Sequence, residues 1–160
     1  MRRIPPPQLE PYLESARRGC FVCEIVAGCD GRHAVVYEDE LAIAFLNRFP
    51  TLHGYVIVAP REHREQVTGD FTEDEFVALQ RVLHRVAEAV RRAVPTERLY
   101  LLSLGSQQGN RHVHWHVAPL PPGVPFEQQQ LAALSWEDGI LELSDEERGE
   151  LAARIRRELV

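Results

Sequence analysis

The chain has 160 residues, 44% of them hydrophobic, and a net charge of −6, which is typical of one ordinary globular domain. It contains no apolar run near the roughly 20 residues that span a bilayer, and no apolar segment after its N-terminal arginines that would indicate a secretory signal. Acidic residues outnumber basic ones, so the net charge does not favour binding to nucleic acid. We therefore expect a cytoplasmic protein that binds neither membranes nor nucleic acids.

The N-terminal part of the chain predicts one short helix followed by strands. Residues 1–19 contain four prolines and predict an extended or irregular lead-in, with at most a short helical turn. The spacing of apolar residues in 20–27 predicts a short helix that ends at Gly28. Three runs rich in strand-forming residues follow, and the first two form a hairpin. These predicted strands cover 34–37, 41–46 and 55–58.

A long helix is the clearest predicted element. Thr72 and Glu75 form the capping-box pattern at its start, and Pro95 ends the run of apolar residues at helical spacing. Two further strands, over 99–104 and 111–119, follow it. These elements predict an α+β fold with a five-stranded, mostly antiparallel sheet, one long helix and one short helix.

The chain changes character after the last predicted strand. Residues 120–125 are rich in proline and cannot form regular structure, and Ser144 caps a final helix that runs towards Leu159. We therefore divide the chain into an N-terminal lead-in (1–19), a core domain (20–120) and a C-terminal extension that ends in this helix (121–160).

Three histidines alternate along the last predicted strand. Because side chains of a strand point to opposite faces in turn, His112, His114 and His116 are expected on one face, about 6.6 Å apart. One histidine there would usually belong to a solvent-facing polar stripe, whereas three in strict alternation favour a functional site. Metal binding and nucleophilic attack on phosphorus both suit imidazole in this arrangement.

Two of the three cysteines stand close together, Cys20 and Cys23, and the odd number does not suggest a disulfide framework. A Cys-x-x-Cys pair can hold zinc, act as a redox couple or lie as two buried thiols. The βαβ context of a thioredoxin-like pair is absent from the predicted elements. Zinc needs two further ligands, and spacing alone does not select them from seven histidines.

The histidine strand and four segments before it resemble the histidine triad (HIT) superfamily, in its Hint-like, nucleotide-hydrolysing branch. The family pattern is His-φ-His-φ-His-φ-φ, where φ is an apolar residue, and it matches 112–118. The earlier segments resemble successive family blocks in the right order, and together they cover about 20–119. These segments are 20–28, 36–39, 44–47 and 54–63. The resemblance implies a HIT-like fold.

The resemblance implies a hydrolase that cleaves a P–N or P–O–P bond at the α-phosphate of a nucleoside phosphoramidate or dinucleoside polyphosphate. His114 would be the nucleophile and form a nucleotidyl-histidine that water hydrolyses; a carbonyl that accepts from Nδ1 would leave Nε2 to attack. His116 would contact the phosphate oxygens and stabilise developing charge. A histidine at this third position, rather than glutamine, favours hydrolysis over transfer to a sugar phosphate.

The same resemblance implies the other substrate-binding residues. Asn47 would hold the ribose hydroxyls, for which similar proteins usually use aspartate. Ser106 and Gln108 would face the phosphates, although either residue also suits an ordinary polar turn. Arg48 stands where similar proteins usually have an apolar residue, so the preference for a purine base does not follow from this position. The apolar base pocket would be lined by Val22, Ile25 and Phe45.

The resemblance also supplies the two missing metal ligands and an oligomeric state. In zinc-carrying members, the second ligand pair is the histidine that ends the Pro-x-x-His block and the first histidine of the triad. The structural zinc ion would therefore be held by Cys20, Cys23, His63 and His112. Similar proteins are homodimers, so we expect a homodimer. The remaining residues of these types are Cys29, expected as a free thiol, and His33, His53 and His84, expected as surface or dimer-contact residues.

Two other functions compete with the hydrolase. One is a non-catalytic nucleotide-binding or scaffold protein of the same fold, which would bind nucleotide without turnover. The other is a mononuclear metalloenzyme that uses all three triad histidines, whose activity would disappear with its metal while the fold stays intact. A structural zinc ion predicts instead that chelation lowers stability.

Overall fold

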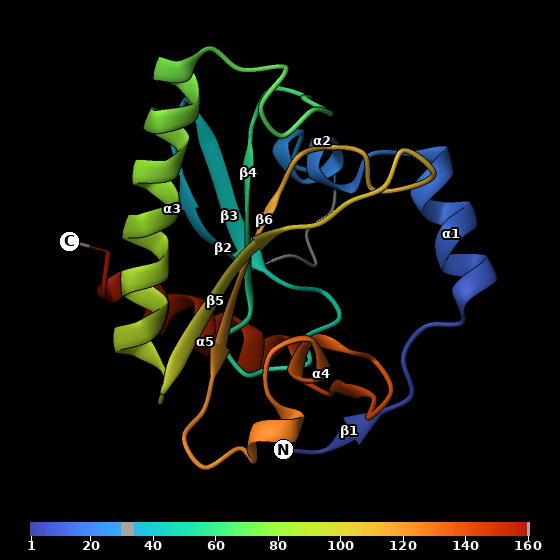
Figure 1. Ribbon diagram of the computed structural model, residues 1–160, viewed down its shortest axis with the longest axis vertical. Coiled ribbons are helices and arrows are strands. Elements are labelled where there is room, and N and C mark those ends of the chain that lie inside the picture. The colour runs from blue at the N-terminus through green and yellow to red at the C-terminus, as the bar shows by residue number, and fades with distance from the viewer. Residues whose placement is uncertain (30–33, 160) are drawn as a thin grey trace.

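The computed structural model in Figure 1 describes residues 1–29 and 34–159, so the predicted role of His33 lies outside the described residues. The strands are β1 (Arg3–Ile4), β2 (Val35–Glu38), β3 (Ala42–Leu46), β4 (Val56–Pro60), β5 (Arg98–Ser103), β6 (Trp115–Leu120) and β7 (Ile140–Leu141). The helices are α1 (Leu9–Arg18), α2 (Phe21–Val26), α3 (Glu73–Ala93), α4 (Leu131–Leu134), α5 (Asp145–Arg157) and a short 3₁₀ helix, η1 (Phe126–Gln128). None of the helices in these two described ranges combines the length and apolar character that crossing a bilayer requires.

The central sheet is antiparallel throughout, with strand order β2-β3-β4-β6-β5, which confirms the predicted fold class. Helices α3 and α5 pack on one face, in a core that includes Trp115 and Val117 of β6. Helix α2 packs on the other face, in a second apolar cluster with Phe45 and Ile57. Because side chains alternate along β6, His116 points towards the α2 face.

The predicted capping box of α3 and the predicted cap of α5 at Ser144 are present, and Cys20 adds an N-cap at α2 that the sequence did not predict. The Thr72 hydroxyl accepts from the Glu75 N–H, and the Glu75 carboxylate accepts from the Thr72 N–H, so α3 begins with the predicted capping box. At the start of α2, Cys20 Sγ accepts from the Cys23 N–H at 3.5 Å. The cap of α2 therefore brings both cysteines to the same helix end.

The N-terminal segment forms more regular structure than its prolines predict. Helix α1 spans ten residues where only a short turn was expected. Pro11 is its third residue, and a proline in the first turn removes an N–H that has no intrahelical partner. Strand β1 pairs with β7, with Ile4 opposite Ile140. The two ends of the chain are therefore joined by a small sheet of their own.

Strand β6 begins at Trp115, four residues later than predicted, and this overturns one expectation about the triad. His112 and His114 precede the ladder, so the three histidines do not share one strand face at equal spacing. The Val113 N–H donates to the Arg64 carbonyl at 2.7 Å, outside the sheet. Because this segment does not pair in the sheet, His112 and His114 point to different neighbours: His112 lies beside the cysteines and His114 lines a cavity.

Helix α5 belongs to the main hydrophobic core although it lies in the predicted C-terminal extension. Ile155 is fully buried there, in the same cluster as residues of α3 and β6. We predict that Ile155→Ala lowers the free energy of unfolding by about 2–5 kcal/mol, because the truncated side chain leaves a cavity. Urea unfolding followed by circular dichroism measures this change. Glu150→Ala, at an exposed position of α5, should change it by less than about 0.5 kcal/mol, and equal effects would contradict the packing described.

Candidate functional site

A cavity of about 750 Å³ opens on the α2 face of the sheet. The predicted residues that line it are Phe45, Asn47, Ser106, Gln108, His114 and His116, and Arg48 lines it too. Val22 and Ile25 do not, because the side of α2 that carries them faces the sheet and buries both in the apolar cluster around Phe45. Phe21 takes their place at the cavity wall, with its ring edge-on to Phe45 at 6.1 Å between centroids.

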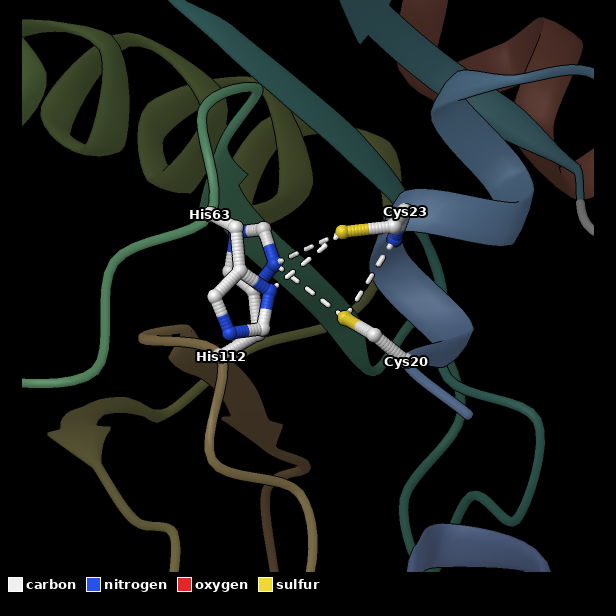
Figure 2. Close-up of side chains that lie close together, drawn as sticks. All are labelled: Cys20, Cys23, His63 and His112. Atoms are coloured by element: carbon white, nitrogen blue, oxygen red, sulfur yellow. Dashed lines mark hydrogen bonds between the residues drawn. The ribbon is translucent and has the colours of Figure 1, made fainter. Parts of the chain in front are cut away.

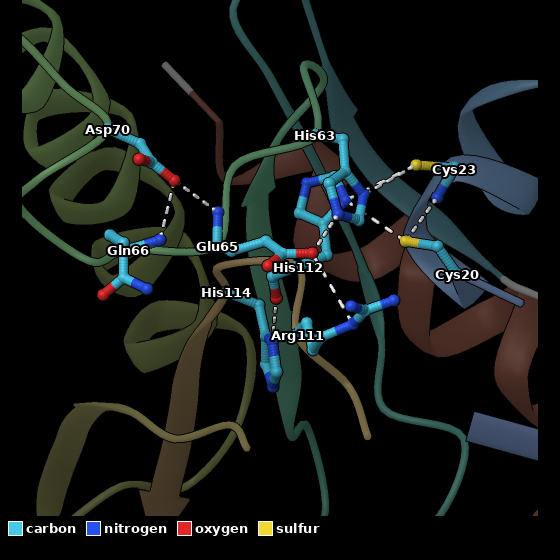
Figure 3. A network of polar contacts seen from close by, with 9 residues as sticks. All are labelled: Cys20, Cys23, His63, Glu65, Gln66, Asp70, Arg111, His112 and His114. Carbon is cyan, nitrogen blue, oxygen red and sulfur yellow. Dashed lines mark hydrogen bonds and ion pairs between the residues drawn. The ribbon is translucent and has the colours of Figure 1, made fainter. Parts of the chain in front are cut away.

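The His114 ring is held by a backbone carbonyl. Its Nδ1 donates to the His112 oxygen at 2.7 Å, so the lone pair of the neutral ring lies on Nε2. Figure 3 shows the ring turned away from the neighbouring cysteines. Burial lowers the pKa of His114, and the hydrogen bond to His112 opposes this shift only in part. The geometry therefore offers a neutral imidazole with a free nitrogen to the cavity.

His116 lies beside His114, with 4.9 Å between the ring centroids. Its Nδ1 is 3.0 Å from the Tyr55 hydroxyl. Burial, followed by the proximity of His114, lowers the pKa of His116 to about 4, so the ring is neutral at pH 7. Its Nε2 is buried, and none of the residues that the structure describes hydrogen-bonds to it.

Two cysteines and two histidines form a separate cluster (Figure 2). The ligand atoms of Cys20, Cys23, His63 and His112 all lie within 4.8 Å of one another. His112 Nδ1 is 3.3 Å from Cys20 Sγ and 3.6 Å from Cys23 Sγ, and His63 Nδ1 is 3.4 Å from Cys23 Sγ. Helix α2 and its N-cap residue supply the sulfurs, and the segments that follow β4 and precede β6 supply the nitrogens. Two sulfur and two nitrogen donors in this arrangement suit a tetrahedral metal ion.

Outer hydrogen bonds orient both imidazoles of this cluster. His112 Nε2 donates to the Pro60 carbonyl at 2.9 Å, and His63 Nε2 is 3.2 Å from Glu65 Oε1 (Figure 3). Each ring therefore directs the lone pair of Nδ1 towards the sulfurs, as metal-ligating histidines do. Burial and the neighbouring Cys20 thiol raise the pKa of Cys23 to about 11. A bound cation would favour the ionised sulfurs that metal coordination needs.

The triad is thus divided between two sites. His112 belongs to the Cys–His cluster, whereas His114 and His116 line the cavity. The cluster does not include the latter two, which argues against a mononuclear centre built from all three triad histidines.

The other histidines and the third cysteine lie apart from the triad. His84 is exposed on α3, and His53 is half-buried with Nε2 3.1 Å from the Arg154 guanidinium. Cys29 is a free, exposed thiol, as predicted.

Part of the cavity wall comes from the N-terminal lead-in and the C-terminal extension, outside the core domain. Tyr12 of α1, Phe49 and Trp136 contact one another edge-on, with ring centroids 5.5 to 5.9 Å apart, and all three line the cavity. Asn110 donates to the Tyr12 hydroxyl, which ties α1 to the loop before the triad. No local pattern marks these aromatic residues, because they meet only through tertiary packing.

Helix α5 supports the backbone of the predicted ribose-binding segment. The Arg148 guanidinium donates to the carbonyls of Asn47 and Arg48 at 3.2 and 3.1 Å. The side-chain oxygen of Asn47 accepts from the Phe49 N–H at 3.0 Å, so part of its hydrogen-bonding capacity is used within its own turn. The Asn47 turn therefore has a defined conformation at the edge of the cavity.

Comparison with known proteins agrees with this geometry. A family model described as HIT domain matches residues 31–122. The adenosine 5'-monophosphoramidase of Schizosaccharomyces pombe is 27% identical over 130 residues, which are 74% of this chain and 94% of that protein. A hypothetical histidine triad nucleotide-binding protein of Sulfolobus tokodaii has a TM-score of 0.71 at 26% identity, over 88% of this chain and 91% of its own. A Zn-bound histidine triad family protein of Mycobacterium smegmatis shares the fold, with a TM-score of 0.66 at 23% identity, over 89% of this chain and 94% of its own. The protein belongs to the HIT domain family.

Proposed function

We propose that the protein is a nucleotide hydrolase in which His114 attacks the α-phosphorus of a nucleoside phosphoramidate or dinucleoside polyphosphate. The observation that carries this proposal is the 2.7 Å hydrogen bond from His114 Nδ1 to the His112 carbonyl, which leaves Nε2 as the reactive nitrogen in the cavity. A neutral imidazole is both a good nucleophile and a good leaving group at phosphorus. Similarity to an adenosine 5'-monophosphoramidase supports a substrate with a P–N bond.

The reaction has two displacement steps at phosphorus. In the first, His114 Nε2 forms a bond to the α-phosphorus while the bond to the leaving amine or phosphate breaks, and the leaving group takes up a proton from solvent. In the second, water attacks the same phosphorus, the bond to Nε2 breaks, and a nucleoside monophosphate leaves as the water proton passes to solvent. His116 contacts the phosphate oxygens and stabilises their charge in both steps.

The same cavity accommodates the rest of the nucleotide. Phe45 and Phe21 offer an apolar wall for a purine base, and Asn47 holds the ribose hydroxyls. Ser106 and Gln108 lie in the loop before the triad and face the phosphates. These assignments are supported by the position of all five residues along one cavity that also contains His114.

We also propose that the Cys–His cluster holds a structural zinc ion. Zn–S bonds of about 2.3 Å and Zn–N bonds of about 2.0–2.1 Å in a tetrahedron separate sulfur from nitrogen by about 3.5 Å. The three sulfur–nitrogen distances of 3.3, 3.4 and 3.6 Å agree with this value. The ion would link α2 to the segments after β4 and before β6. The Zn-bound protein of Mycobacterium smegmatis, which has the same fold, supports the choice of metal.

A homodimer and a cytoplasmic location complete the proposal. Strand β5 lies at the edge of the sheet. Leu101 in this strand and Leu104 directly after it are about half exposed, at 49% and 52%. A second copy of the chain could cover these leucines by extending the sheet. A reducing compartment would keep the cysteines available as zinc ligands.

The nucleophile is tested by His114→Ala. We predict that kcat for an adenosine phosphoramidate and a diadenosine polyphosphate falls by about 10³-fold or more, because the variant lacks the nitrogen proposed to carry the nucleotidyl group. Steady-state assays measure this, and His84→Ala, on the exposed side of α3, should keep full activity. Turnover that persists in His114→Ala would contradict the assignment. Tight nucleotide binding by the wild type without turnover of either substrate would favour a binding protein instead.

Zinc is tested by Cys23→Ser together with chelation. The purified protein should contain one zinc ion per chain by elemental analysis, and the variant much less. Losing a ligand, or the metal itself, should lower the melting temperature by about 5–10 °C, since metal binding stabilises the folded state. Cys29→Ser, at the exposed thiol, is the matched control and should behave as the wild type. Chelation that abolishes activity at an unchanged melting temperature would point to a catalytic metal.

A further inference from the structure

Tyr55 is a buried residue at the wall of the cavity, and its hydroxyl contacts the triad residue His116. It immediately precedes β4, which pairs with β6, and its side chain reaches the ring of His116. The hydroxyl lies 3.0 Å from His116 Nδ1, and the two rings meet edge-on at 5.7 Å. Tyr55 is 5% exposed, so water has little access to this contact.

We propose that Tyr55 is a positioning residue that holds His116 in the tautomer with its proton on Nε2, so that this nitrogen donates a hydrogen bond to a phosphate oxygen. The proposal rests on the proposed function, because it concerns the group that would face the substrate phosphate. It adds a residue for which the sequence predicted no role in the site.

The count of donors and acceptors selects this tautomer. A neutral imidazole has one N–H and one acceptor nitrogen, and a phenol has one O–H. If Tyr55 donates to Nδ1, both of these groups are satisfied and only the Nε2–H of His116 remains open. In the opposite tautomer Nδ1–H would donate to the phenol oxygen. The buried O–H would then lack an acceptor among the described residues, and a lone pair would face the phosphate.

Burial supports the same direction of donation. It raises the pKa of Tyr55, so the phenol keeps its proton throughout the physiological range. It lowers the pKa of His116, so Nδ1 is free to accept. Nε2, buried and without a partner among the described residues, is then a donor that lacks an acceptor until an oxygen enters the cavity.

The two adjacent histidines are thereby given opposite tautomers. A carbonyl accepts from His114 Nδ1 and leaves a lone pair on its Nε2, whereas a phenol donates to His116 Nδ1 and leaves a proton on its Nε2. With 4.9 Å between the ring centroids, one phosphate group can meet a nucleophile from one ring and a hydrogen-bond donor from the other. This donor strengthens its contact as negative charge develops on the oxygens during attack.

The test combines Tyr55→Phe with nitrogen NMR of the histidine rings in the purified protein, with His116 signals identified by their loss in His116→Asn. Wild-type His116 should carry its proton on Nε2 and show a hydrogen-bonded Nδ1, and Tyr55→Phe should lose that signature. For an adenosine phosphoramidate, kcat/KM should fall about 3–10-fold, as expected for the loss of one neutral hydrogen bond. Tyr100→Phe removes a hydroxyl that accepts from the Gln130 N–H outside the cavity, and should change neither.

A wild-type spectrum with the proton on Nδ1 would overturn the proposal, and so would a Tyr55→Phe protein whose His116 spectrum and kcat/KM are unchanged. Urea unfolding of Tyr55→Phe separates a loss of fold from a loss of positioning. If the wild type turns over no phosphoramidate, the proposed function fails, yet the NMR spectrum still decides which nitrogen carries the proton.

Discussion

The hydrogen bond from His114 Nδ1 to the carbonyl of His112 joins the two halves of the site. The backbone of His112 fixes the ring proposed to attack phosphorus, while its side chain belongs to the Cys–His cluster and donates to Pro60 at the end of β4. Anything that holds the His112 backbone therefore also fixes the direction of His114 Nε2. A metal ion in the cluster would act on the reaction in this way, by rigidity and without touching the substrate.

The two ends of the chain complete the cavity that the central sheet begins. Tyr12 of α1 and Trp136 close one side of it, and Arg148 of α5 holds the backbone of the Asn47 turn. All three lie outside the segment matched by the family model. Since β1 pairs with β7 and α5 packs into the main core, these contributions come from integrated parts of the fold. Differences in substrate between relatives can arise from such segments while the histidines stay the same.

The sequence predicted most of what depends on local pattern. The capping box at Thr72, the helix that begins beside Cys20 and the five strands were all expected, because capping and periodicity are written in neighbouring residues. The resemblance to a family added His63 and His112 as partners of the two cysteines, a choice that spacing alone left open. The late start of β6 was not foreseen, since the Val113 N–H donates to the carbonyl of Arg64, which is far away in the chain. Helix α1, the aromatic wall and the contact between Tyr55 and His116 also depend on tertiary packing. So does the burial of Val22 in the apolar cluster instead of at the cavity wall.

The central claim is that a nucleotidyl group passes through His114. Rapid quenching of the wild type with an adenosine phosphoramidate, followed by mass spectrometry of the digested protein, tests it directly. We predict an adenylyl group on the peptide that contains residue 114, bound to the histidine ring, which forms and decays at rates consistent with turnover. An adenylyl group on another residue, or full turnover with no covalent intermediate at any time, would contradict the account.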